Sequence, residues 1–178
     1  MGLSISALLL LLTLSIFTSG LSHFQKTDTR LALSQTGALA MRRITEDLRS
    51  AISVSVAPDG RSMTYELPLL SGAVDPVTGE REYVVPIQSD GIVRSFYEES
   101  DVLYYQVAAD DPFILAEGVS ATDPDEGSIY FGLSYPIFEF ETVGTSSGIR
   151  VTLIGQEDLG RSIEVSRMSS FVKLQDTS

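Results

Sequence analysis

The first twenty-five residues of the chain carry no formal charge and are dominated by Leu, Ile, Phe and small residues. The stretch MGLSISALLLLLTLSIFTSGLSHFQ ends where Lys26 brings in the first charge. A secretory signal peptide places positive charge ahead of its apolar segment, whereas here the first basic residue follows it. A membrane-spanning helix needs about twenty mostly apolar residues, and Leu3 to Phe24 has that length. The pattern favours a retained apolar helix, held in lipid or packed against other helices.

The next stretch changes from uniformly apolar to amphipathic. Apolar or small residues recur in steps of three and four, which marks one face of a helix, while Arg42, Arg43 and Glu46 fall on the opposite face. No proline precedes Pro58. We therefore expect one nearly continuous helix over residues 1–52, apolar over 1–25 and amphipathic over 26–52, about 75 Å long. The residues expected to pack this helix on the rest of the chain are Leu31, Ala38, Met41, Ile44, Leu48 and Ile52.

Beyond residue 52 the hydrophobic period becomes two. Runs such as REYVVPIQ, DVLYYQVA and GIRVTLIG alternate with turn sequences such as PDG, SGAVDPVTGE and GTSSG, which is typical of strands joined by tight turns. We expect residues 53–178 to form a head that is one antiparallel meander of seven or eight strands, with one sheet face laid on the amphipathic half of the helix. The alternation changes parity near Ser166 and Arg167, which predicts a β-bulge there. The fold class is α+β.

Charge is divided unevenly between these two parts. Residues 1–56 carry five basic and three acidic side chains, a balance of +2, and residues 57–178 carry seven basic and twenty-one acidic ones, a balance of −14. An acidic head is repelled by nucleic acid and by anionic membrane surfaces. Its charge favours solubility where many copies lie close together. We expect no contact between the head and nucleic acid.

Catalytic chemistry finds little support in the sequence. The chain has no Cys, and its one His, His23, lies at the end of the apolar stretch rather than near a strand, so thiolate sites and a histidine triad in the head are excluded. We expect no enzyme, no catalytic residue and no cofactor. The run DPDEGS places Asp123, Asp125 and Glu126 close together, and such oxygens suit calcium. A solvated turn is the simpler interpretation of this weak calcium candidate.

Several segments together resemble a known family. The order of an apolar N-terminal helix, an amphipathic helix and a β head resembles type IV pilins and the pseudopilins of type II secretion, and is similar to J-type minor pseudopilins and W-type minor pilins in particular. MRRITEDLRSAISV resembles the end of their helix, VLYYQV and FILAEGVSA their middle strands, and GIRVTLIG with RSIEVSRMSSFVKL their closing hairpin. The resemblance implies a pilin-like α+β fold.

The resemblance also implies a structural role. A subunit of this kind waits in the inner membrane and is then drawn by inner-membrane assembly machinery into an extracellular filament at the cell surface, a pilus, where copies of itself or other pilin-like subunits replace the lipid. The family's acidic fifth residue has no counterpart, since Ile5 stands there and the first acid is Asp28. Docking would then depend on hydrophobic packing, or the subunit would come first at a tip. The expected membrane and filament-core residues are Leu3, Ile5, Leu8, Leu9, Leu10, Leu11, Leu12, Leu14, Ile16, Phe17, Leu21 and Phe24.

Two other functions remain open at the level of sequence. The first alternative is a minor pseudopilin at the tip of a type II secretion pseudopilus, where contacts of the head with sister subunits matter most. From a different class, it would suit a membrane-tethered or secreted β-domain that binds calcium or a carbohydrate. Long fibres made chiefly of this chain would favour the pilus, and a head stabilised by calcium or a glycan would favour the binding domain.

Overall fold

The structure, a computed structural model, describes residues 2–74, 76–79, 81–120, 122–123, 132–144, 146–159 and 163–174. Within the N-terminal helix the side chains are described from Leu10 onward. One long helix, α1 (Gly2–Ser50), is followed by strands that form antiparallel sheets. The strands are β1 (Ser53–Val56), β2 (Ser62–Glu66), β3 (Leu70–Val74), β4 (Arg81–Tyr83), β5 (Arg94–Glu99), β6 (Val102–Val107), β7 (Phe113–Glu117), β8 (Phe138–Val143), β9 (Ser146–Asp158) and β10 (Ile163–Lys173).

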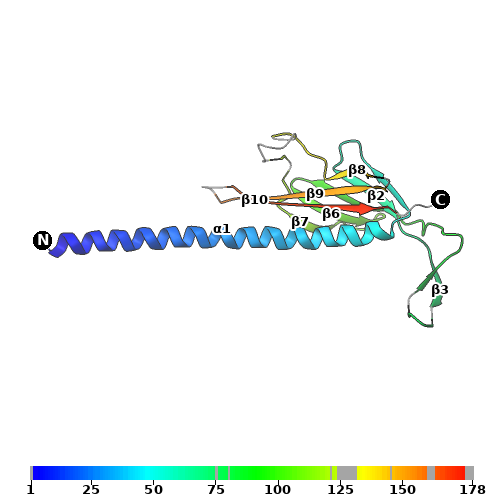
Figure 1. Ribbon diagram of the computed structural model, residues 1–178, viewed down its shortest axis with the longest axis horizontal. Coiled ribbons are helices and arrows are strands. Elements are labelled where there is room, and N and C mark those ends of the chain that lie inside the picture. Colours follow the sequence, from blue (N-terminus) through cyan, green and yellow to red (C-terminus); the bar gives the residue numbers. More distant parts are fainter. Residues whose placement is uncertain are drawn as a thin grey trace.

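Helix α1 is continuous, as the sequence predicts. It ends at Ser50, where the chain turns directly into the first sheet: the amide of Ala51 donates to the carbonyl of Leu48 (3.2 Å), and the amide of Ile52 donates to the carbonyl of Glu66 (3.0 Å). The β-branched and serine residues that follow favour a strand over another helical turn. Figure 1 shows the sheets lying along the C-terminal half of α1 while its N-terminal half projects beyond them.

The strands form three sheets within the described part of the chain. The larger sheet has the order β1-β2-β5-β6-β7, the second has the order β10-β9-β8, and β3 pairs with β4 alone. The expectation of one meander of seven or eight strands is therefore wrong. The β3–β4 hairpin is inserted between β2 and β5, which are neighbours in the larger sheet, and SGAVDPVTGE, expected to be only a turn, contributes most of β3.

The predicted bulge at Ser166 and Arg167 is also absent from the described pairing. Strands β9 and β10 pair residue for residue from the Ile163–Asp158 pair to the Lys173–Gly148 pair. Val165 and Met168 lie on opposite faces of β10 and are both half-buried. Because both faces of β10 are partly covered, the apolar pattern changes parity without an extra residue.

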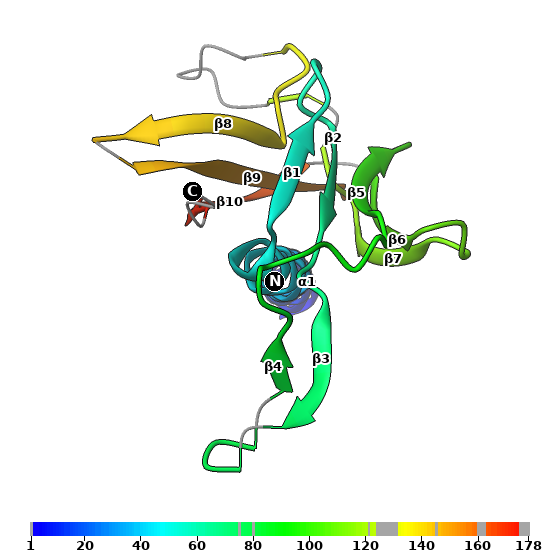
Figure 2. The same cartoon turned by 90° about the vertical axis from the view of Figure 1, so that its right-hand side faces the viewer.

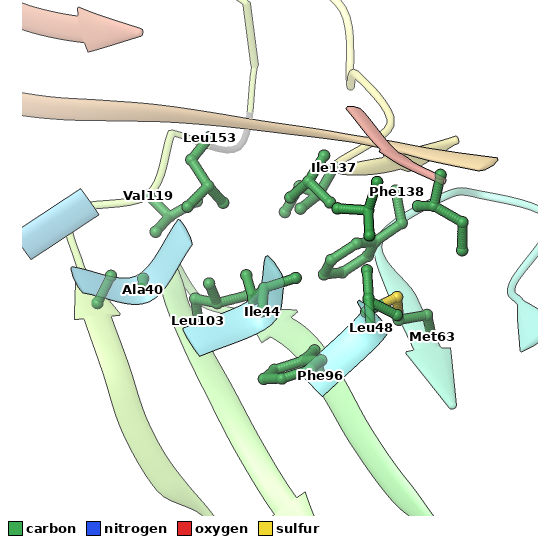
Figure 3. Packing of buried hydrophobic residues seen from close by; sticks show 14 of the residues in the cluster. Ala40, Ile44, Leu48, Met63, Phe96, Leu103, Val119, Ile137, Phe138 and Leu153 are labelled. Carbon is green, nitrogen blue, oxygen red and sulfur yellow. The ribbon is translucent and has the colours of Figure 1, made fainter. Parts of the chain in front are cut away.

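The core lies between the two larger sheets and the C-terminal half of α1. Figure 3 shows α1 side chains Ala40, Ile44 and Leu48 between residues of both sheets. Tyr65 and Phe96 stack within this core, with ring centroids 5.3 Å apart. Core residues from the sheets and their connections include Met63, Phe96, Leu103, Val119, Ile137, Phe138 and Leu153. Burial of each large apolar side chain contributes roughly 1.5–3 kcal/mol, so this half of the helix is part of the head's own core.

The helix residues that make this contact differ in part from those expected. Ile44 and Leu48 are fully buried, and Met41 and Ile52 are half-buried, but Leu31 and Ala38 are exposed and do not pack on the head. At about 100° per residue, Leu31 points roughly 140° away from Ile44, whereas Leu33 lies within about 20° of it. The buried positions follow one regular stripe: Leu33, Gly37, Ala40, Ile44, Leu48 and Ala51.

The buried stripe was not predicted from the sequence because one of its positions is a glycine, Gly37. A Cβ at Gly37 would lie 2.0 Å from the Cε of Met168 on β10, so the end of the flexible Met168 side chain lies in the space that a side chain at position 37 would take. Small residues carry no hydrophobic signal in a sequence pattern. The larger Leu31 therefore dominated the pattern, although it lies on the opposite side of the helix.

Candidate functional site

The projecting half of α1 exposes a large apolar surface. Every described residue from Leu10 to Gln25 is exposed, and the large hydrophobic side chains among them are between 48% and 71% accessible. The members of the expected filament core that the structure places there are Leu10, Leu11, Leu12, Leu14, Ile16, Phe17, Leu21 and Phe24. The side chains of Leu3, Ile5, Leu8 and Leu9 lie outside the described residues. An apolar surface of this extent indicates an interaction with another apolar body.

One row of this surface continues along the helix past the projecting half. Leu10, Phe17, Phe24, Leu31 and Ala38 follow one another at intervals of seven residues and are all exposed. Leu14 and Leu21 fall between them at the spacing of a coiled-coil seam. We call these seven residues the outer stripe. Leu31 and Ala38, which do not pack on the head, belong to this stripe instead.

The outer stripe and the buried stripe lie on different sides of α1. Ala38 and Leu31 point roughly 120° and 140° away from Ile44 at 100° per residue. The head therefore covers one side of the helix and leaves the outer stripe open along its whole length. A seven-residue apolar period also favours left-handed supercoiling with a neighbouring helix.

Two threonine hydroxyls on the projecting half bond back within the helix. The hydroxyl of Thr18 donates to the carbonyl of Ser15 and that of Thr27 to the carbonyl of His23, each at 3.0 Å. Hydroxyls that bond back to the preceding turn can enter an apolar environment without an external partner. His23 itself is exposed on this half of α1.

Over the part of the chain that the structure describes, no helix combines the length and the mean hydropathy of a membrane span.

A polar contact joins the other half of α1 to the larger sheet. The hydroxyl of Tyr65 donates a short hydrogen bond to Asp47, and Arg43 Nε lies 3.2 Å from Asp47 Oδ2. The guanidinium of Arg43 lies over the ring of Tyr105, 5.1 Å from its centroid. Burial raises the pKa of Tyr65, and the hydrogen bond to Asp47 raises it further. These contacts fix the rotation of α1 against the sheet, and with it the direction of the outer stripe.

The calcium candidate does not assemble in the described residues. Asp123 is fully buried, and its Oδ2 accepts a hydrogen bond from Arg167 Nη2 at 2.8 Å. Its carboxylate is thus already matched by a positive charge. Asp125 and Glu126 lie outside the described residues. Among those described, no group of three or more His, Asp or Glu side chains is placed to hold a metal ion.

A polar hollow of about 240 Å³ lies beside the end of β7. The Oγ of Ser120 lies 2.6 Å from the carbonyl oxygen of Thr122 and 2.8 Å from the side-chain oxygen of Gln156. The chain's one histidine is on the projecting half of α1, so Ser120 has no imidazole base. The described residues that line the hollow are Asp101, Gly118, Val119, Ser120, Thr122, Gln156 and Asp158.

Two grooves flank α1 where it meets the sheets. A groove of about 560 Å³ runs between α1 and β10, lined by Ala38, Met41, Thr45, Met168 and Ser170 among others. A second groove, of about 370 Å³, lies between α1 and the edge strand β7. We call the second one the β7 groove; it is lined by Arg43, Tyr105, Val107, Asp110, Asp111, Phe113 and Leu115.

The sequence analysis missed one exposed apolar region altogether. The β3–β4 hairpin and its flanks, residues 69–87, form an arm that extends from the head, and most of its large apolar side chains are exposed. Within LPLLSGAVDPVTGEREYVVPIQ the sequence analysis expected REYVVPIQ to be a strand and SGAVDPVTGE to be a turn, but it did not predict that the segment stands apart from the core. The signal that could have found it is the density of Leu, Val, Ile and Tyr in a segment too rich in turn residues for the core.

No family model, no curated protein and no solved structure matches this chain.

Proposed function

We propose that this chain is a structural subunit of an extracellular, type IV pilus-like filament, built by packing of the projecting half of α1 against the helices of other copies. The observation that carries the proposal is the division of one unbroken helix. Its C-terminal half is buried in the head, while its N-terminal half is apolar, exposed and far too large a surface to leave in water.

The energetics favour a permanent apolar environment for the projecting half. At roughly 1.5–3 kcal/mol for each large side chain, the exposed Leu, Ile and Phe residues from Leu10 to Phe24 represent a free energy as large as a typical domain's whole stability or larger. We propose that the helix is first held in the inner membrane, with the assembly machinery, and then passes directly among neighbouring helices. The subunit's partners are copies of itself or other pilin-like chains.

The outer stripe supplies the geometry of that packing. Its seven-residue spacing suits knobs-into-holes contact with a neighbouring helix, and it continues beside the head as far as Ala38. Beside Ala38 the stripe reaches the groove between α1 and β10, where charged side chains, Arg42, Glu46 and Arg49, lie next to smaller ones. The strongly acidic head then keeps the filament surface soluble.

The test compares two arginine substitutions on opposite sides of the same helix segment. Phe24→Arg places a charge in the outer stripe, and Ser22→Arg places one roughly 160° away on an equally exposed position. Both lie close to Lys26, so each charge can reach the membrane surface before assembly. The measurement is the amount of filament in the sheared surface fraction, seen by electron microscopy.

We expect Phe24→Arg to abolish filaments and Ser22→Arg to retain them, with the thermal unfolding of the head unchanged in both. A charge in an apolar helix interface costs about 2.5–3.5 kcal/mol per subunit, and the loss repeats at every contact. Normal filaments from Phe24→Arg would exclude the proposal. Short assemblies confined to the cell envelope would indicate a secretion pseudopilus instead.

A further inference from the structure

One of the two rows of the outer stripe becomes polar toward the head. Leu14 and Leu21 form the start of this row, and at the same seven-residue interval it continues with four exposed polar residues. We call these four residues the polar extension; they are Asp28, Gln35, Arg42 and Arg49. At 100° per residue, Asp28 points about 40° away from Phe24, and Arg42 points about 40° away from Ala38. The surface that faces another helix therefore carries charges at fixed heptad positions.

The polar extension is open to a neighbouring molecule. The two larger sheets lie on one side of α1, and the β3–β4 hairpin, on the other side, lies at the C-terminal end of the helix (Figure 1 and Figure 2). The side chain of Arg42 is 76% accessible, and its Nε donates to Glu46 Oε1 at 2.7 Å. The remaining nitrogens of a guanidinium are further donors, so Arg42 can accept a second carboxylate as a partner.

Two parallel copies of α1 keep this heptad pattern matched only when one is shifted along the other by whole heptads. Without a shift, Asp28 meets Asp28 and Arg42 meets Arg42, which places like charges together. A shift of one heptad places Asp28 of the second copy opposite Gln35, and the arginines of the two copies, Arg42 and Arg49, opposite each other. A shift of two heptads places Asp28 of the second copy opposite Arg42, and Gln35 opposite Arg49.

A shift of three heptads leaves one arginine without a polar partner. It places Asp28 of the second copy opposite Arg49, but it also places the apolar Leu21 opposite Arg42. A charge held in an interface without a partner is strongly destabilising. In all three shifted arrangements Asp28 of the first copy faces an apolar residue of the second, so the arginines decide between them. Only the shift of two heptads gives both Arg42 and Arg49 a polar partner.

We propose that α1 of one copy packs in parallel on α1 of a second copy with a shift of two heptads, so that Asp28 of the second copy pairs with Arg42 of the first. The shift is about 21 Å along the helix axis, at 1.5 Å per residue. This inference rests on the proposed function and specifies its helix contact. Residues 10–28 of one copy meet residues 24–42 of the next, and a contact between two different segments repeats as an open chain.

The test uses disulfide cross-linking, because the native chain has no cysteine. Three full-length variants carry Phe24→Cys together with Leu31→Cys, Ala38→Cys or Thr45→Cys, which face position 24 of a neighbour after shifts of one, two and three heptads. None of these substitutions changes a charge. Phe24→Cys alone is the control, because one cysteine per chain can join only two chains. Intact cells are oxidised, and the products are separated on a denaturing gel with and without reductant.

We expect the Ala38 pair to give a reducible ladder of trimers and longer species. It should be at least about tenfold stronger than the ladder from the Leu31 or the Thr45 pair, which corresponds to a preference of about 1.4 kcal/mol. The control should give no species beyond dimers. A stronger ladder from either of the other pairs, three ladders of equal strength, or no ladder from any pair would overturn the inference.

An exchange of charges tests the ion pair without cysteines. Asp28→Arg and Arg42→Asp each place like charges together, so each should reduce the amount of sheared filament at least about tenfold, and the two combined should restore it. The matched control combines Asp28→Arg with Arg49→Asp, on the same row, and should not restore filaments. Restoration by the Arg49 variant, or by neither, would overturn the inference. Thermal unfolding of the head should stay close to native, because the contact of Arg42 with Glu46 is exposed.

The register and the filament role fail separately in these experiments. Filaments of the native chain, together with no ladder from the Ala38 pair, would remove the register and leave the filament role. A ladder from the Ala38 pair in cells whose native chain makes no filaments would support the register and remove the filament role.

Discussion

The two halves of α1 have the same backbone and opposite consequences for stability. In the C-terminal half, Ile44 and Leu48 are completely buried by the head, while in the N-terminal half Leu14 and Phe17 are more than half accessible. Both halves are rich in apolar residues and neither is interrupted by proline. The comparison teaches that apolar content makes the helix, but only the presence of the sheets decides which part of it belongs to the folded core.

The largest difference should appear when the same substitution is made in each half. Leu48→Ala removes buried methyl groups and leaves a cavity, which costs about 2–5 kcal/mol, whereas Leu14→Ala changes a side chain that the head never contacts. We expect the first to lower the denaturation midpoint of the full chain in detergent and the second to leave it unchanged. An equal loss of stability in both variants would show that the halves are not distinct.

A smaller difference should come from the polar contact that sets the rotation of the helix. Tyr65→Phe removes the donor to Asp47, a loss of about 1–3 kcal/mol for a partly buried carboxylate. Thr27→Val removes a hydroxyl that bonds only within the projecting half and should leave head stability unchanged. Chemical denaturation followed by tyrosine fluorescence measures both.

The raised pKa of Tyr65 leads to a prediction about the stability of the chain at alkaline pH. Burial raises the pKa of Tyr65 and raises that of Tyr135 to about 12. Since the unfolded tyrosine ionises near pH 10, the folded chain keeps protons that the unfolded chain loses, and stability falls as pH rises above about 10. We expect a decline from pH 10 to 12 in the native chain and a shallower decline in Tyr65→Phe. A native profile that is flat over this range would contradict it.

The smallest predicted effects distinguish the two glycines of α1. A Cβ added at Gly20 would meet no atom within 4 Å. Gly20→Ala should therefore stabilise the helix by up to about 1 kcal/mol, because alanine has a higher helix propensity than glycine. In Gly37→Ala the same gain is opposed by the contact with Met168. We therefore expect Gly37→Ala to stabilise the chain less than Gly20→Ala does, and its gain in unfolding free energy to be larger when Met168→Ala is already present. If the effects of Gly37→Ala and Met168→Ala on the unfolding free energy were additive, the close contact between positions 37 and 168 would be contradicted.

Much of the fold could be predicted because it depends on local pattern. The long helix follows from uninterrupted helical spacing, and segments such as DVLYYQVA became strands because β-branched and aromatic residues suit a pleated surface. The wrong expectations concern positions where the same sequence pattern is compatible with two structures. Leu31 is apolar yet exposed, on the side of the helix that the head does not cover, and the parity change at Ser166 and Arg167 reflects a strand partly covered on both faces rather than a bulge.

The candidate site, like the fold, could be predicted from the sequence only in part. The exposed apolar half of α1 was visible in the sequence as a charge-free stretch, but its extension through Leu31 and Ala38 required knowledge of which side the head covers. Asp123 appeared to be an available ligand, yet its pairing with Arg167 joins residues far apart in sequence. The arm was not predicted because a pattern of strand and turn residues does not show whether a hairpin packs on the core or stands apart from it.

By itself, the sequence determined the continuous helix, its apolar first half, the β-rich head and the separation of charge, since each follows from the properties of neighbouring residues. Only the tertiary structure decided that the strands divide into three sheets, that Gly37 rather than Leu31 meets the head, and that the arm stands apart from the core. These depend on contacts between distant segments, where shape and burial select among patterns that are locally equivalent.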